Sequence, residues 1–336
     1  MKMPSLEIGS LTAEFPIIQG GLAIRISMAS LAAAVAEEGG IGLIAGSGMH
    51  PPELAAEIRK ARKLTDGIIG VNIMVAAREF KQLVQVALRE KVDLVVAGAG
   101  FSRDVFKWCA KAGTPFAPII SHERLVGPSL KYGASAIIVE GKEAGGHLGT
   151  AIKLKKILPS ILETVGGRIP VIAAGGVLEG SDIAEMLAMG ASGVQMGTRF
   201  AASDESSACN AFKQAYVDAG PNDVVIIESP VGLPGRALLT PFTQKILDGT
   251  VPPPNTLSKC VACMSADHCK KNYCIVDALV NAQTGDDMDN AVIFCGERVG
   301  EIKKILPVRT IMHDLVQGFE RETRDWNLNK KLPVRS

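Results

Sequence analysis

The 336 residues suffice for one large α/β domain or two smaller ones, and 36 lysines and arginines against 35 aspartates and glutamates leave a net charge of +1. This balance excludes a general electrostatic attraction to nucleic acid or to acidic membranes. The N-terminus has no apolar core of signal-peptide length, and Glu37 and Glu38 interrupt the most apolar run, so we expect a cytoplasmic protein without a membrane span.

Eight short apolar segments recur along the first 200 residues, and glycine or other small or polar residues stand at their C-terminal ends. Such segments are typical of buried parallel strands. The predicted strands are residues 15–19, 41–44, 68–74, 93–96, 115–119, 136–140, 170–173 and 192–196. Predicted helices lie between them at residues 30–38, 52–64, 79–90, 153–165 and 181–189. This alternation favours a (β/α)8 TIM barrel over a doubly wound sheet, because the first strand is not followed by a GxGxxG turn.

The alternation of strands and helices stops near residue 200. We expect residues 1–202 and 296–336 to form the barrel, with a closing helix over about 308–321. Residues 203–295 contain a predicted helix at 207–219, proline-rich segments and most of the cysteines. We interpret this stretch as a cysteine-rich cap or insert packed over the barrel mouth, where the active site of such a barrel lies.

The turns after the seventh and eighth predicted strands read AAGG and MGTRF. Gly175, Gly176, Gly197 and Thr198 would expose backbone amides and a hydroxyl at the barrel mouth. Barrels commonly bind phosphate at these two turns, because the amides point at the anion. The alternative is that tight strand-to-helix turns simply need glycine.

One histidine, His147, follows the sixth predicted strand in the glycine-rich sequence EAGGHLG, directly after Gly146. A histidine is suited to proton transfer near neutral pH, and flanking glycines allow a ligand to approach. The alternative is a loop histidine that is exposed by chance. Glu140 is expected to help orient this loop, and Glu143 to be a solvated charge.

Four cysteines, Cys260, Cys263, Cys269 and Cys274, lie close together beside His268. In a protein without an export signal, thiolates at short spacing favour an iron–sulfur cluster or zinc over structural disulfides. The spacing fits neither ferredoxin pattern, so the metal identity stays open, and free or redox-active thiols are the alternative.

Seven motifs at strand ends occur in a characteristic order: PIIQGGLA, GGIGLIAGSG, GVNIMV, GAG, EGKEAGGHLG, PVIAAGGV and GVQMGTRF. Together they resemble the FMN-dependent nitronate monooxygenase (2-nitropropane dioxygenase) family, which includes the similar enoyl-ACP reductase II enzymes. The resemblance implies an FMN across the barrel mouth and matches His147 to the family's catalytic histidine. The implied cofactor-binding residues are Gly20, Gly21, Leu22, Gly46, Asn72, Gly146, Ala174, Gly175, Gly176, Gln195, Gly197 and Thr198.

The chain departs from the resembled family in two places. The four-cysteine cluster is one, and the late sequence FCGERVG, which places Cys295 and Glu297 where neutral residues are usual, is the other. The cysteine cluster lies in the expected cap, so it bears on the substrate, whereas Cys295 and Glu297 lie near the expected flavin site.

Two functions follow from the resemblance, and the cysteines suggest a third. The first is oxidation of alkyl nitronates through FMN, with His147 in proton transfer or substrate binding. The second is an NAD(P)H-dependent reduction of an enoyl-ACP or other enoyl thioester. The third is a flavin and thiol redox sensor without turnover. The expected partner is a small-molecule or acyl-thioester substrate, and a homodimer is left open.

Overall fold

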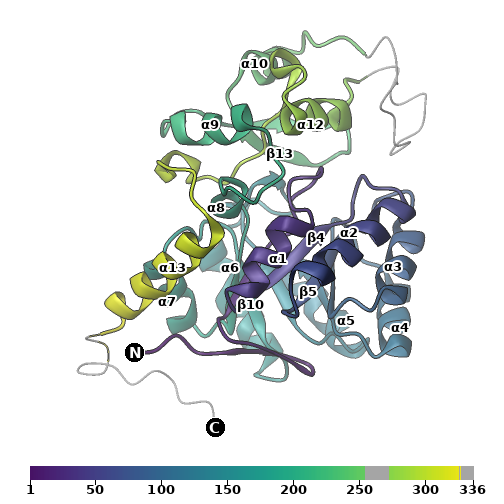
Figure 1. Ribbon diagram of the computed structural model, residues 1–336, viewed down its shortest axis with the longest axis vertical. Helices are drawn as coiled ribbons and strands as arrows, with labels where there is room; N and C mark the ends of the chain where they lie inside the picture. Colours follow the sequence, from purple (N-terminus) through teal and green to yellow (C-terminus); the bar gives the residue numbers. More distant parts are fainter. Residues whose placement is uncertain (254–271, 325, 327–336) are drawn as a thin grey trace.

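The computed structural model describes residues 1–253, 272–324 and 326, and its centre is a closed barrel of eight parallel strands (Figure 1). The strands follow one another around the barrel in the order β10-β11-β3-β4-β5-β6-β7-β8. Their bounds are β3 (Ile17–Gln19), β4 (Ile41–Ala45), β5 (Ile69–Met74), β6 (Leu94–Gly98), β7 (Phe116–Ile120), β8 (Ile137–Glu140), β10 (Val171–Ala174) and β11 (Gly193–Met196). Each corresponds to a predicted strand, so the TIM-barrel prediction is confirmed.

Helices cover the outside of the barrel. They are α1 (Ala29–Glu37), α2 (Pro51–Leu64), α3 (Phe80–Arg89), α4 (Arg103–Ala112), α5 (Val126–Lys131), α6 (Leu154–Val165), α7 (Gly180–Ala188) and the short α8 (Thr198–Ala201), with a 3-10 turn at Glu123–Leu125. The closing helix α13 (Val308–Glu322) crosses α7 at Gly180, where a Cβ atom would lie 2.2 Å from the amide nitrogen of Phe319. Only glycine permits the two helices to approach this closely.

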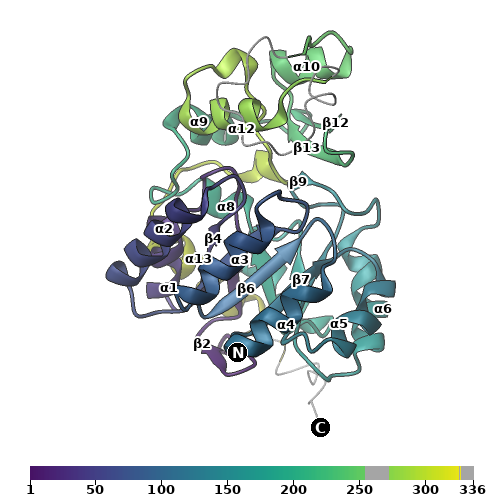
Figure 2. The ribbon, with the colours of Figure 1, turned by 90° about the vertical axis from the view of Figure 1, so that its right-hand side faces the viewer.

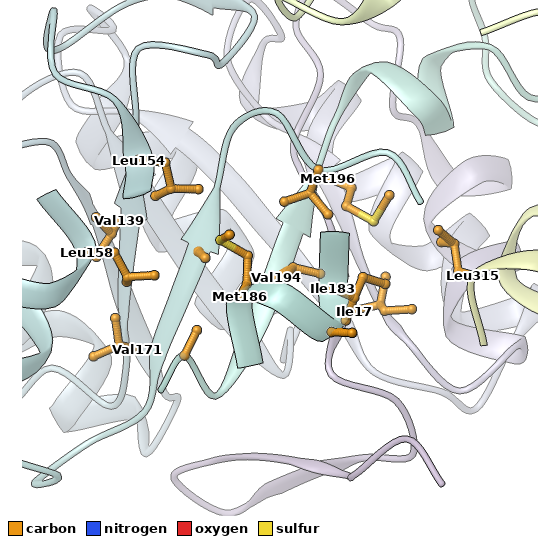
Figure 3. Packing of buried hydrophobic residues seen from close by; sticks show 14 of the residues in the cluster. Ile17, Val139, Leu154, Leu158, Val171, Ile183, Met186, Val194, Met196 and Leu315 are labelled. Carbon is orange, nitrogen blue, oxygen red and sulfur yellow. The ribbon is translucent and has the colours of Figure 1, made fainter. Parts of the chain in front are cut away.

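Two layers of apolar side chains hold the barrel together. Side chains such as Val139, Val171 and Val194 on the strands pack outward against Leu158 and Leu315 on the surrounding helices (Figure 3). A second cluster fills the barrel itself and includes the N-terminal hairpin of β1 (Leu6–Ile8) and β2 (Leu11–Ala13). This hairpin therefore closes the end of the barrel opposite the C-terminal ends of its strands.

The elements between α8 and α13 lie above the C-terminal ends of the barrel strands (Figures 1 and 2). They are α9 (Asn210–Asp218), β12 (Val224–Glu228), β13 (Pro234–Leu238), α10 (Pro241–Leu247), α12 (Ile275–Thr284) and the 3-10 turns Met288–Asn290 and Val299–Glu301. Strands β12 and β13 form a three-stranded antiparallel sheet with β9 (Gly146–His147), which comes from a barrel loop. This sheet joins the cap to the predicted catalytic loop. No helix in the described part of the chain is long and apolar enough to cross a membrane.

Candidate active site

A cavity of about 780 Å³ lies at the C-terminal ends of the barrel strands, beneath the cap. Cavities of this size, largely apolar and with few polar groups, typically bind cofactors and small molecules. All of the predicted cofactor-binding residues except Gly46 line it, and so does His147. Gly46 instead faces the packed interior, where a Cβ atom would lie 3.0 Å from Ile73 and 3.2 Å from Val71.

The two predicted phosphate-binding turns lie at one end of this cavity. Gly175 and Gly176 adopt positive φ angles of 109° and 72°, which explains the need for glycine at both positions. The amides of Gly175, Gly176, Gly197 and Thr198 donate no hydrogen bond to any described residue. The hydroxyl of Thr198 accepts a hydrogen bond from the Gly296 amide at 2.9 Å, which leaves its own hydrogen to donate. This concave set of donors suits an anion.

Arg298 holds the first of these turns in place. Its guanidinium donates to the carbonyl oxygen of Gly176 at 2.8 Å and to the carboxylate of Asp182 at 2.7 Å. It also pairs with both carboxylate oxygens of Glu301. With two carboxylates beside it, the guanidinium acts by fixing the turn rather than as a free cation.

His147 is held by the cap. Its Nε2 atom lies 2.8 Å from the hydroxyl oxygen of Ser229, in the loop between β12 and β13. Its ring and that of Phe294 pack edge to face at a centroid distance of 5.0 Å, and its backbone pairs with Gly235 of β13. Burial lowers the pKa of His147 to about 4, so the imidazole is neutral at neutral pH.

Arg236 of β13 fastens the loop that carries His147. This buried guanidinium donates to the carbonyl oxygens of Lys142 at 2.6 Å and Ala144 at 3.1 Å. The carbonyl oxygen of Arg236 accepts from the amide of Cys295 at 3.1 Å. One residue thus links the cap, the histidine loop and the late FCGERVG turn.

Two glutamates near His147 have different surroundings. Glu140 ends β8 and lines the cavity, where burial raises its pKa to about 7. Glu143 accepts a hydrogen bond from the amide of Leu154 at 2.9 Å, at the N-terminus of α6. The expectation that Glu143 is a solvated charge is therefore wrong, because its carboxylate accepts a hydrogen bond from a backbone amide that has no partner within the helix.

The cavity continues from the barrel mouth into an apolar wing under the cap. This wing is lined by Ile24, Met49, Val231, Leu233, Ile275, Val276 and Leu279. Its side chains come from both the barrel loops and α12, so an apolar ligand would contact the barrel and the cap together.

Comparisons with known proteins agree with this geometry. The family model described as nitronate monooxygenase matches residues 5–81 and 75–318. The chain belongs to the nitronate monooxygenase family. The resemblance predicted from the motifs is thereby confirmed, as is the prediction of an enzyme, an oxidoreductase.

Members and neighbours of the nitronate monooxygenase family differ in their reactions. A Mycobacterium tuberculosis relative described as (3aS,4S,5R,7aS)-5-hydroxy-7a-methyl-1-oxo-octahydro-1H-indene-4-carboxyl-CoA dehydrogenase is 36% identical over 238 residues. That match covers 70% of this chain and 66% of the relative, just under two thirds of its length. FabK from Thermotoga maritima is 33% identical with a TM-score of 0.84, over 95% of this chain and 96% of that one. Nitroalkane oxidase from Streptomyces ansochromogenes is 25% identical with a TM-score of 0.78, over 93% and 97%.

The nitronate monooxygenase family is flavin-dependent, and the cavity fits a flavin nucleotide. The side-chain oxygen of Gln195 is buried without a hydrogen-bond partner in the described part of the chain. Such an oxygen requires a donor, and the ring of a flavin carries an N–H group that can supply one. The free amides around Gly175 and Gly197 suit its phosphate.

The structure describes one of the four cysteines predicted to bind a metal. Cys260, Cys263 and Cys269 lie outside the described residues, as does His268. Cys274 is the N-cap of α12, where its sulfur accepts from the amide of Asp277 at 3.4 Å. Among the described residues, no group of three or more potential ligands is placed to hold a metal ion. An iron–sulfur cluster or zinc at these cysteines therefore stays a prediction.

Residue patterns alone missed several residues of this nitronate monooxygenase family site. Ser229 and Arg236 belong to the sequence SPVGLPGR, which reads as an exposed loop. Arg298 and Phe294 flank the late turn, in which the sequence pattern had indicated only Cys295 and Glu297. The proline and glycines of SPVGLPGR signal a tight turn, but nothing local shows which side chains that turn buries.

Proposed function

We propose that the protein is an FMN-dependent oxidoreductase that reduces an enoyl thioester with electrons from NAD(P)H. The observation that carries this proposal is the apolar wing that extends from His147 to α12. A small nitronate would leave the wing empty, whereas the acyl chain of a thioester would fill it. The relatives described as a carboxyl-CoA dehydrogenase and as FabK, an enoyl-ACP reductase II, support the same substrate class.

Different residues of the chain would bind different parts of the cofactor. Gly175, Gly176, Gly197 and Thr198 bind the FMN phosphate, and Gln195 faces the ring. The other predicted residues that line the cavity would contact the ring; they are Gly20, Gly21, Leu22, Asn72, Gly146 and Ala174. When bound, FMN supplies the hydride chemistry that no amino-acid side chain provides.

His147 would bind the thioester carbonyl. Its ring is neutral at pH 7, because burial lowers its pKa to about 4. A neutral imidazole stabilises developing negative charge on a carbonyl oxygen through a hydrogen bond, without transferring a proton in advance. Residues of the cap exclude water from this hydrogen bond and so strengthen it.

Anaerobic visible spectroscopy tests the proposal. We expect NADH or NADPH to bleach the flavin absorbance, and a 2-enoyl-CoA to restore it with formation of the saturated thioester. Reduced flavin that does not respond to any enoyl thioester would contradict the proposal.

Oxidation of alkyl nitronates is the second candidate, because the matching family model bears that description. It predicts a flavin that neither nicotinamide reduces and that an alkyl nitronate bleaches without oxygen. The same spectra therefore separate the two functions.

A further inference from the structure

The hydroxyl of Ser229 and the Nε2 atom of His147 form a buried pair at 2.8 Å. Ser229 is only 6% exposed and lies in a tight turn. Its carbonyl oxygen accepts a hydrogen bond from the Gly232 amide at 2.9 Å, and its own amide donates to the carbonyl oxygen of Leu233. Gly232 adopts a φ of 79°, which closes the turn. The backbone hydrogen bonds of this turn therefore fix the position of Ser229, so it does not move readily with the ring of His147.

The hydrogen-bond partners and the burial of the two side chains indicate whether Ser229 or His147 donates. The hydroxyl of Ser229 has one partner among the described residues, Nε2 of His147, and the Nδ1 atom of His147 has none. If Nε2 carried the proton and donated to Ser229, the buried hydroxyl hydrogen would have no acceptor there. If the hydroxyl donates instead, the hydrogen without a described acceptor is Nδ1–H of His147, a residue that lines the cavity, whereas Ser229 is buried and does not line it. Because buried donors are nearly always satisfied, the free donor belongs on the cavity-lining residue, so the hydroxyl donates and Nε2 accepts. The proton of the neutral ring is then on Nδ1.

We infer that Ser229 is a positioning residue that holds His147 as the Nδ1–H tautomer and so turns the histidine into a hydrogen-bond donor toward the cavity. Three further contacts keep the ring in register with the serine. These are the pairing of His147 with Gly235, the hydrogen bond from the Leu148 amide to Pro234 at 2.8 Å, and the ring of Phe294. All of them come from the cap or the late turn rather than from the barrel.

The tautomer matters for the reaction. An Nδ1–H group can donate to the carbonyl oxygen of a thioester, whereas removal of a proton from carbon requires an unprotonated nitrogen. This consequence rests on the proposed function, but the tautomer itself does not.

Nuclear magnetic resonance of protein labelled with 15N-histidine tests the tautomer without substrate or turnover. Long-range 1H–15N correlations distinguish protonated Nδ1 from protonated Nε2, and the H147Q variant identifies the signals of His147. We expect Nδ1 to be the protonated nitrogen in the native protein near pH 7. A protonated Nε2 would overturn the inference.

Variants of Ser229 test its role. Ser229→Ala should convert His147 to the other tautomer or to a mixture, and lower kcat about tenfold with little change in KM, because a neutral hydrogen bond is lost. Ser229→Thr keeps the hydroxyl and should restore both the spectrum and kcat. An unchanged His147 spectrum in Ser229→Ala would overturn the inference, and if that variant does not fold, Ser229→Cys replaces it as a weaker donor. An Nδ1–H tautomer in a protein that reduces no thioester would refute the proposed function and leave the inference standing.

Discussion

The guanidinium of Arg298 lies 2.8 Å from the carbonyl oxygen of Gly176 and thereby ties the late FCGERVG turn to the turn after β10. Gly176 cannot hold its own conformation, because a glycine at a φ of 72° has no side chain to restrict it. The orientation of the amides proposed to bind phosphate thus depends on Arg298, a residue more than a hundred positions away in the sequence.

Replacing Arg298 by alanine is expected to weaken FMN binding about tenfold, since on the order of 1 kcal/mol of hydrogen bonding to the turn is lost. Fluorescence titration of flavin-depleted protein with FMN measures the affinity. Arg309→Ala is the matched control, because Arg309 is an exposed arginine 3.9 Å from Glu38 on the barrel's outer face. Equal affinities of the two variants would contradict the role assigned to Arg298.

Glu140 and His147 are expected to affect stability in opposite directions over nearly the same pH range. Burial raises the pKa of Glu140 from 4.5 to about 7, so between these values the native protein binds a proton that the unfolded chain has lost. The free energy of unfolding therefore falls as pH rises through that range. Burial lowers the pKa of His147 from 6.5 to about 4, and here the unfolded chain binds the extra proton, so the free energy of unfolding rises with pH.

The two opposite contributions should nearly cancel in the native protein, because each is at most on the order of 3 kcal/mol. Glu140→Gln should leave only the histidine contribution, so its stability relative to the native protein should increase from pH 4.5 to pH 7. His147→Gln should show the reverse trend. Urea denaturation across this range measures both, and variants that follow the native curve at every pH would show that neither residue is buried as described.

The barrel could be predicted from sequence because its strands are buried on both faces. Segments such as Ile41–Ala45 therefore appear as short apolar runs that end in glycine. The family motifs added the cavity residues, since each motif occupies a strand end. Gly46 was the exception, because the motif that contains it contributes neighbouring residues to the cavity instead.

The cap could not be predicted in the same way. Strand β12 is half exposed, β13 begins with Pro234 and Gly235, and β9 has two residues, so none of them shows a strand pattern. Arg236 illustrates the difficulty, because a charged residue after glycine suggests an exposed loop, whereas tertiary contacts bury it against two carbonyl groups. Helix α12 does carry helical spacing of apolar residues, and periodicity could have found it.

Gly145 allows the histidine loop and the late turn to touch. A Cβ atom at this position would lie 2.6 Å from the carbonyl carbon of Cys295 and 2.8 Å from the amide of Gly296. Gly145→Ala should therefore displace the late turn, weaken FMN binding and destabilise the protein by about 1–3 kcal/mol. Gly127→Ala, on α5 with no atom within 4 Å of the added Cβ, should change neither property adversely. Thermal denaturation and FMN titration compare the two, and a fully native Gly145→Ala would show that the contact is not close.

Leu279 on α12 tests whether the apolar wing binds an acyl chain. Truncation to alanine removes apolar contact worth about 1–2 kcal/mol to a ligand that reaches it, at ~0.8 kcal/mol for each buried methylene. We expect Leu279→Ala to raise KM about tenfold for long-chain enoyl thioesters and hardly at all for four-carbon ones, whose short chains bury little apolar surface. Leu247→Ala on α10 is the control, because that side chain is 47% exposed and does not line the cavity. A uniform rise in KM at every chain length would mean that Leu279 supports the cap as a whole, and the substrate would then be bound elsewhere in the cavity.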